Sequence, residues 1–318
     1  MPINRVPFSE KTGSSDSHKK AITVPAFQLV EPRYSFADVL LKEETLQEIQ
    51  SALALYRFHD LIFDTWGFSA VFHRSKNLSI NLYGASGTGK TMTANAIAQQ
   101  LHLPILLVNY AEIESKYVGE TAKNLESLFG FAQSKAAVLV FDEADALLSK
   151  RVTDMRSAAD VSVNQTRSVL LRLLDEYEGI ILFTTNFIQN FDPAFYRRIM
   201  YHVRFDLPDQ PLREKLWAHY MVHQFPVQGD RKELIARLAE REGFSGSDIA
   251  TAVLKTAIHT ALAANPSATY NDFMEQLDKI QTARDAINGS EVEITTRKVS
   301  KDYVTEKLGK DVIHDGNA

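Results

Sequence analysis

The stretch GASGTGKT, at residues 84–91, has the residue types and spacing of a loop that holds phosphate groups. It fits the pattern G-x-x-x-x-G-K-[ST], in which glycines let backbone N–H groups approach phosphate oxygens. Lys90 would neutralise the terminal phosphates of the ligand, and the Thr91 hydroxyl would bind Mg²⁺. A glycine-rich turn in front of a helix is the alternative. The residues predicted to bind the nucleotide here are Gly84, Ala85, Ser86, Gly87, Thr88, Gly89, Lys90, Thr91 and Met92.

A second set of reactive side chains lies in VLVFDEAD, at residues 138–145. Four apolar residues are followed by Asp142, which would hold the Mg²⁺ together with Thr91 and so also counts as a nucleotide-binding residue. Glu143 is placed to orient or activate the attacking water. In the alternative interpretation, these acids only cap a helix that starts at Ala144.

The elements that must position these residues are predicted by the alternation of short apolar runs with helical patterns between residues 35 and 207. The runs are LSINLY, PILLVN, AVLVF, GIILFT and HVRF. Between them, apolar residues recur at helical spacing, as in the sets Ala94, Ile97, Ala98, Leu101; Leu125, Leu128, Phe129, Ala132; and Leu170, Leu173, Leu174, Tyr177. This alternation predicts an α/β fold with a parallel sheet and helices on both faces.

The rest of the chain divides into three further segments. Residues 1–34 are polar and contain scattered prolines, which predicts a flexible tail. After LPDQP, residues 208–290 are predicted to form a smaller all-helical domain, in which Ala250, Val253, Leu254 and Ala257 share one helix face. Residues 291–318 form a C-terminal extension without a clear pattern.

Composition excludes several classes of function. The 318 residues are 45% hydrophobic with a net charge of −5, as in ordinary soluble proteins, and the mild acidic balance makes nucleic acid an unlikely partner. The absence of cysteine excludes disulfides and thiolate chemistry. Neither a signal core near the N-terminus nor an apolar run of membrane-spanning length is present, so we expect a cytoplasmic protein.

Four motifs together resemble the AAA+ ATPases, in particular the clade that remodels proteins. They are GASGTGKT, VLVFDEAD, TTN at 184–186 and FDPAFYRRI at 191–199, and the resemblance covers about residues 35–288. It implies a large ATPase domain with a five-stranded parallel sheet, over residues 35–207, and a helical lid domain. By the same resemblance Asn186 senses the γ-phosphate, Arg197 is the arginine finger that reaches the neighbouring subunit, and Arg198 is the backup candidate. The alternatives are a turn residue and ordinary surface charges.

The segment ESKYVGETAKNL, at 114–125, resembles the pore loop with which this clade grips polypeptide. Tyr117 and Val118 take the gripping positions, and residues 150–167 would line a second loop. An aromatic ring can wedge between the side chains of an extended chain without reading its sequence. Alternatively, Tyr117 anchors the start of a helix.

The function expected from the resemblance is that of an ATP-hydrolysing protein remodeller. It would act as a homo-oligomeric ring of six, use ATP and Mg²⁺, and thread part of a protein substrate, directly or through an adaptor. Its domain organisation is similar to that of the ATPases that convert HORMA-domain proteins between conformers, including bacterial ones in anti-phage signalling. The alternative is a nucleotide-controlled switch or loader that acts on a protein or DNA complex.

Overall fold

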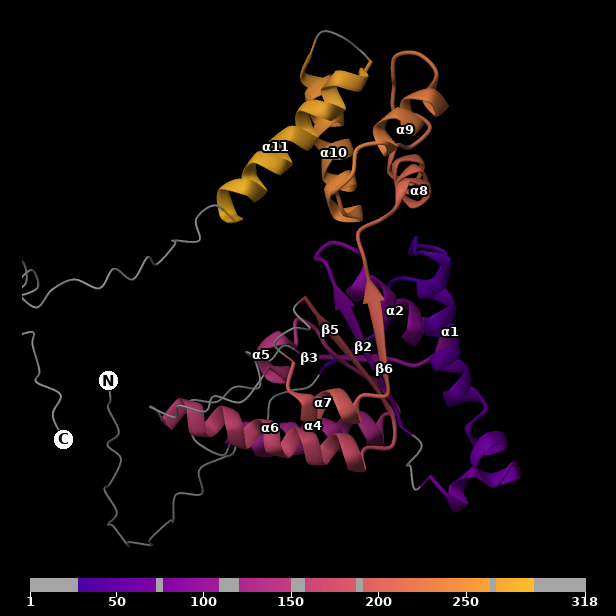
Figure 1. Ribbon diagram of the computed structural model, residues 1–318, viewed down its shortest axis with the longest axis vertical. Helices are drawn as coiled ribbons and strands as arrows, with labels where there is room; N and C mark the ends of the chain where they lie inside the picture. The colour runs from indigo at the N-terminus through magenta and orange to yellow at the C-terminus, as the bar shows by residue number, and fades with distance from the viewer. Residues whose placement is uncertain are drawn as a thin grey trace, which may run out of the picture. The chain divides into compact units, whose positions relative to one another are not determined.

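A computed structural model describes residues 28–72, 77–108, 120–149, 158–186, 191–263 and 267–288 (Figure 1). The chain divides into two compact units between Leu212 and Arg213. This division falls five residues after the end of the predicted large domain, inside a helix that continues into the second unit. Each unit is described by itself below.

The first unit is built on a six-stranded sheet in the order β1-β3-β4-β5-β2-β6. Five strands are parallel, and they coincide with the five apolar runs of the sequence: β2 (Leu78–Gly84), β3 (Ile105–Val108), β4 (Val138–Phe141), β5 (Ile180–Thr185) and β6 (Tyr201–Phe205). The predicted α/β fold with a parallel five-stranded sheet is therefore confirmed.

The sixth strand was not expected. Leu29 and Val30 form β1, which pairs antiparallel with Leu106 and Ile105 of β3 at the edge of the sheet. The prediction that the flexible tail extends to residue 34 is wrong for these two residues, while residues 1–27 of that tail lie outside the described part of the chain. β1 could not be predicted from the sequence, because two residues are too few to show an alternating pattern.

Helices cover both faces of the sheet (Figure 1). Residues of α1 (Glu43–Arg57) and α2 (Lys90–Leu101) form one buried cluster with β2 and β5. A second cluster lies on the opposite face and contains residues of α4 (Glu120–Ser134), α5 (Asp145–Leu148), α6 (Ala158–Glu176) and α7 (Pro193–Arg198). The central strands β4 and β5 are buried along their whole length, which explains their unbroken apolar sequences.

Two short helices follow α1 before β2 begins. They are the π-helix η1 (Leu61–Thr65) and the 3₁₀-helix η2 (Phe68–Ala70), separated by Gly67 with a positive φ of 76°. Most of their side chains are exposed, including aromatic ones.

The described part of the second unit contains most of α8 (Gln210–Tyr220), together with α9 (Arg231–Ala239), α10 (Gly246–Leu262) and α11 (Tyr270–Asn288). Trp217 and Phe273 pack edge to face in its core, with ring centroids 5.7 Å apart. Ser245 and Asp248 form a capping box at the start of α10. The buried face of α10 carries Ile249, Ala252, Val253 and Thr256, whereas Leu254, which was expected to share the inward face with Val253, is 63% exposed.

Candidate functional site

The loop GASGTGKT joins the end of β2 to the start of α2, as its sequence predicts. Gly84, Gly87 and Gly89 adopt positive φ values of 136°, 74° and 96°, a region that glycine enters without steric cost. A Cβ atom on Gly84 would lie 2.1 Å from the backbone oxygen of Phe205 on β6, so only glycine fits there. The shape of the loop therefore depends on backbone conformations that glycine adopts readily.

Lys90 is buried at the centre of the site. Its Nζ donates to the backbone oxygens of Gly84 at 2.9 Å and Ala85 at 2.8 Å, and to Oδ1 of Asn186 at 2.8 Å. Burial lowers the pKa of Lys90, and the nearby carboxylates of Asp145 and Asp142 oppose that shift. The ammonium group is therefore held within reach of both the phosphate loop and the end of β5.

Asp142 comes directly after β4 and lies beside the phosphate loop. The Thr91 hydroxyl donates to its Oδ1 at 2.9 Å, so the two predicted metal ligands are brought together. The Thr184 hydroxyl, from β5, also donates to Oδ1 of Asp142. The carboxylate is oriented from two elements that are far apart in the sequence.

Glu143 occupies a strained backbone position next to Asp142. Its φ is +51°, which is uncommon for a residue with a side chain, and its backbone N–H donates to Oγ1 of Thr184 at 3.0 Å. The side chain of Glu143 is exposed. This conformation keeps the second acid out of the buried interior while its neighbour is held by Thr91 and Thr184.

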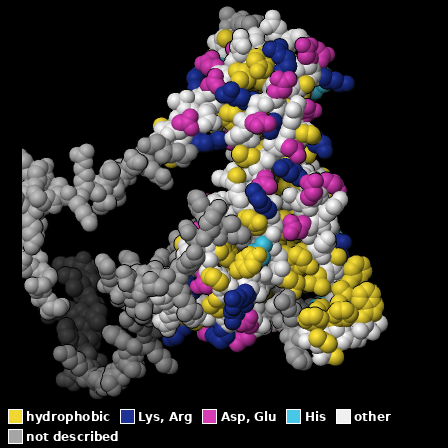
Figure 2. Space-filling view, viewed as in Figure 1, with side chains coloured by type: hydrophobic (Ala, Val, Ile, Leu, Met, Phe, Trp, Pro, Cys, Tyr) yellow, Lys and Arg dark blue, Asp and Glu magenta, His cyan; other side chains and the backbone are white. Residues whose placement is uncertain are grey.

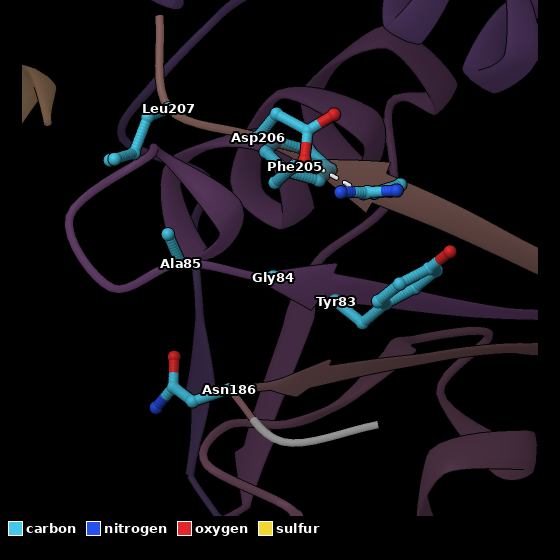
Figure 3. A pocket seen from close by; sticks show the side chains of 8 residues that line it. Tyr83, Gly84, Ala85, Asn186, Phe205, Asp206 and Leu207 are labelled. Carbon is cyan, nitrogen blue, oxygen red and sulfur yellow. Dashed lines mark hydrogen bonds and ion pairs between the residues drawn. The ribbon is translucent and has the colours of Figure 1, made fainter. Parts of the chain in front are cut away.

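Asn186 ends the segment that leads out of β5, opposite the phosphate loop. Its backbone N–H donates to both carboxylate oxygens of Asp145, at 3.0 and 3.2 Å, while its side chain accepts from Lys90. Figure 3 shows its amide beneath Ala85 and Gly84. The amide therefore connects the strand end to the lysine.

Arg197 and Arg198 both lie on α7 but differ in their surroundings. The Arg198 Nε donates to Asp175 of α6, with a shortest distance of 2.9 Å, and its Nη1 donates to the backbone oxygen of Ala194. The side chain of Arg197 is exposed and makes no ion pair or hydrogen bond with any residue in the described part of the chain. Of the two arginines, Arg197 is the one whose guanidinium can reach another molecule.

Comparison with known proteins identifies the family. The family model for "ATPase family associated with various cellular activities (AAA)" matches residues 80–207. The proteasome-activating nucleotidase of Pyrococcus furiosus is 30% identical over 294 residues, which cover 88% of this chain and 71% of that protein. The chain belongs to the AAA family.

Other AAA relatives agree with this assignment. The proteasome-activating nucleotidase of Saccharolobus solfataricus is 29% identical over 82% of this chain and 66% of its own length. The 26S proteasome regulatory subunit 4 homolog of Schizosaccharomyces pombe is 28% identical over 80% of this chain and 56% of its own length. The chain therefore spans between about half and about two thirds of the length of these two relatives.

The AAA site has oxygen ligands that suit Mg²⁺. Thr91 and Asp142 supply a hydroxyl and a carboxylate oxygen, which are hard ligands. No group of three or more His, Cys, Asp or Glu side chains that could hold a metal appears among the residues that the structure describes. Mg²⁺ usually keeps several water ligands and binds phosphate oxygens, so Thr91 and Asp142 alone fit the protein's share of such a site.

A cavity of about 680 Å³ opens beside the phosphate loop (Figure 3). It is lined by Tyr83, Gly84, Ala85, Asn186, Arg204, Phe205, Asp206 and Leu207. All of these residues belong to the first unit, at the carboxyl ends of β2, β5 and β6. Ligands of open parallel sheets bind at this edge.

Sequence reasoning missed two residues of the site. Thr184 joins Asp142 to the Glu143 backbone, and Asp145 holds the Asn186 backbone. Both lie inside recognised motifs, TTN and VLVFDEAD. Their positions at the ends of two predicted strands are the sequence feature that could have identified them. Tyr117, Val118 and residues 150–157 of the predicted pore loops lie outside the described residues. The prediction that the second loop extends to residue 167 is wrong, because α6 begins at Ala158. No described helix is long and apolar enough to cross a membrane.

Proposed function

We propose that this chain hydrolyses ATP as one subunit of a homo-oligomeric ring and uses the energy to change the conformation of a protein substrate. The observation that carries the proposal is the convergence of Lys90, Asp142 and Asn186 at three neighbouring strand ends. The names of the relatives support it, because they are proteasome-activating nucleotidases and proteasome regulatory subunits.

Each side chain of the site has a distinct task in this reaction. Lys90 carries a positive charge toward the terminal phosphates, and Asn186 holds the lysine in place. Thr91 and Asp142 would bind Mg²⁺, which neutralises charge that builds up on the phosphate oxygens when it is bound. Glu143, exposed beside them, would accept a proton from the attacking water or orient it.

Arg197 would complete the site of a neighbouring subunit. A finger supplied from outside contributes about 10³- to 10⁵-fold in rate in comparable phosphoryl transfer. Its exposure supports this role, whereas Arg198 is engaged with Asp175 of its own chain. Hydrolysis would then depend on assembly, for which a ring of six is proposed.

The finger is tested by comparing Arg197→Ala with Arg198→Ala. We expect Arg197→Ala to bind ATP but to lose at least 100-fold in turnover, while Arg198→Ala keeps turnover within a few-fold. Mixing Arg197→Ala with Glu143→Gln should restore part of the activity, because some interfaces then pair an intact finger with an intact glutamate. Full activity of Arg197→Ala, or of the wild type as a dilute monomer, would refute the proposal.

The protein substrate would be gripped by Tyr117 and Val118. Tyr117→Ala should keep basal ATP turnover and the melting temperature but fail to convert a substrate, and Tyr117→Phe should keep full function because the ring face supplies the contact. A HORMA-domain protein is the substrate class proposed from the sequence resemblance. A pull-down with Glu143→Gln in the presence of ATP identifies the partner, because this variant should prolong the complex. If the chain is instead a nucleotide switch or loader, it should bind its partner without converting it.

A further inference from the structure

The first unit departs from the usual separation of apolar interior and polar surface, both outside and inside. Outside, hydrophobic side chains gather over η1 and η2 (Figure 2). Inside, polar side chains alternate with apolar ones along β2, because Ser79 and Asn81 lie between Leu78, Ile80 and Leu82. Ser79 is 4% exposed and Asn81 is 0% exposed. A buried polar group costs free energy unless hydrogen bonds compensate it, so the partners of these two side chains matter.

Asn81 receives a hydrogen bond from the neighbouring strand. The hydroxyl of Thr185, which ends β5 and is 1% exposed, donates to Oδ1 of Asn81 at 3.1 Å. The amide nitrogen of Asn81 is buried and has no hydrogen-bond partner among the residues that the structure describes. A leucine has the same number of side-chain heavy atoms and would avoid the cost of this unpaired nitrogen. What asparagine adds at this position is therefore an acceptor for Thr185.

Thr185 directly precedes Asn186, the proposed sensor of the terminal phosphate. The two threonines of TTN are held from opposite faces of β5, because the Thr184 hydroxyl donates to Asp142 whereas the Thr185 hydroxyl donates to β2. Asn186 follows them at the end of the strand (Figure 3), and its Oδ1 accepts from Lys90 at 2.8 Å. The bond to β2 therefore fixes the residue from which the sensor leaves the sheet.

Ser79 lies two residues before Asn81, on the same face of β2, and bonds to the chain at the end of α7. Its hydroxyl donates to the backbone oxygen of Arg198 at 3.3 Å and accepts the backbone N–H of Met200 at 3.0 Å. Both partners come directly after Arg197, the proposed finger. One buried hydroxyl thus holds the backbone that carries the guanidinium of Arg197.

We propose that the buried polar face of β2 positions both the sensor and the finger of the proposed reaction. Asn81 holds Thr185 and thereby directs Asn186 toward the terminal phosphate in its own subunit. Ser79 holds the end of α7 and thereby directs Arg197 toward the phosphate in the neighbouring subunit. Both are positioning residues, because each acts through another residue. This inference rests on the proposed function, and it explains why polar side chains occupy a strand whose burial favours apolar ones.

The role of Asn81 is tested with the double variant Asn81→Leu and Thr185→Val. Both replacements keep the branching of the side chain and remove both partners of one hydrogen bond, so the melting temperature should stay within a few degrees of the wild type or rise. We expect ATP turnover, measured well below the melting temperature, to fall by roughly tenfold or more. The affinity for ADP, which lacks the terminal phosphate, should stay within a few-fold.

Two single variants are the controls for this experiment. Thr185→Ser keeps the hydroxyl and should keep turnover within a few-fold of the wild type. Thr256→Val replaces another threonine that is 0% exposed, in the second unit, whose hydroxyl has no hydrogen-bond partner among the described residues, and it should leave turnover unchanged. A double variant with wild-type turnover, or one that loses ADP affinity as much as turnover, would refute the role of Asn81.

The role of Ser79 is tested by mixing subunits. Ser79→Ala should lose turnover by roughly fivefold or more but keep its own sensor, whereas the double variant keeps its finger. In a mixed ring, the interface at which the double variant supplies the finger and Ser79→Ala supplies the sensor is intact. The mixture should therefore turn over ATP faster than the mean of the two separate proteins. Residues that served only the stability of the fold would give the mean.

The pair Arg197→Ala and Glu143→Gln is the reference for this mixing experiment. If that pair regains activity and the new pair gives only the mean, positioning by β2 is refuted while the ring and its finger stand. If neither pair regains activity, the proposed finger is refuted as well.

Discussion

Thr184 is the residue through which a small change in the sheet should reach Glu143, the glutamate proposed to activate water. It is 2% exposed, its hydroxyl donates to Asp142, and it accepts the Glu143 N–H at 3.0 Å. Thr184→Val keeps the shape of the side chain and removes both bonds. A hydrogen bond to a charged group is worth about 1.5–3 kcal/mol and an orphaned N–H costs about 1 kcal/mol, so we expect a loss of roughly 2–4 kcal/mol in the free energy of unfolding.

The same substitution should slow ATP turnover more than it weakens ATP binding. Glu143 holds its positive φ of 51° partly through the bond to Thr184, and a displacement of about 1 Å at a reacting group costs about 100-fold in rate. Lys90 and the glycine loop make no hydrogen bond to Thr184, so the affinity for ATP should stay within a few-fold. Thr184 is thus a positioning residue in the proposed hydrolysis.

The assay combines thermal melts, ATP binding by calorimetry and steady-state turnover. For a unit of about 200 residues each 1 kcal/mol lowers the melting temperature by about 2–4 °C, so Thr184→Val should melt roughly 5–15 °C early. Thr184→Ser is the control, since it keeps the hydroxyl and should stay within a few-fold of wild-type turnover. If Thr184→Val turns over ATP as fast as Thr184→Ser, the glutamate is not positioned through this hydroxyl.

Three further predictions follow from single sites. Gly84→Ala should abolish measurable ATP binding in calorimetry, because its Cβ would lie 2.1 Å from the oxygen of Phe205. Burial lowers the pKa of His202 in the folded protein below its ordinary 6.5. The stability that neutral His202 contributes is therefore complete above pH 6.5 and is lost as the pH falls through the pKa of the folded state. Between about pH 7 and 5, the melting temperature of His202→Gln should fall less than that of the wild type. Burial raises the pKa of Tyr177 to about 12, so stability falls as the pH rises from about 10 to 12, by up to roughly 2–3 kcal/mol, and Tyr177→Phe should lose less over that range.

The central strands β4 and β5 were predictable because they are buried along their whole length, and such strands require mostly apolar sequence. The phosphate loop was predictable for a related reason, since Gly84 and Gly89 occupy backbone conformations that other residues adopt only with strain. The order of the strands was not predictable from the runs, because an apolar run does not say which other strand it pairs with. Only the pairing of the strands in the structure shows that β5 lies between β4 and β2. This arrangement brings Thr184 beside Asp142.

Residues whose roles depend on distant neighbours were beyond the reach of local patterns. Arg197 and Arg198 are identical in type and adjacent, and what distinguishes them is Asp175, on a different helix. Leu254 fits a helical repeat as well as Val253 does, but the spacing does not tell on which side of α10 the rest of the unit packs. The sequence pattern gives the helical periodicity, but only the packing of the unit shows which face of the helix is buried.

The hydrogen bonds of Lys90 suggest how phosphate binding reaches the rest of the molecule. The buried Lys90 ammonium needs acceptors, and it donates to two loop carbonyls and to the Asn186 amide. Phosphate oxygens are charged and form stronger bonds, so a bound terminal phosphate competes for the same ammonium. Asn186 would then lose or share its partner, while its backbone stays fixed to Asp145. Asn186 precedes α7 in the chain, so we expect the exchange of this bond to be one way in which bound phosphate influences the proposed finger, Arg197.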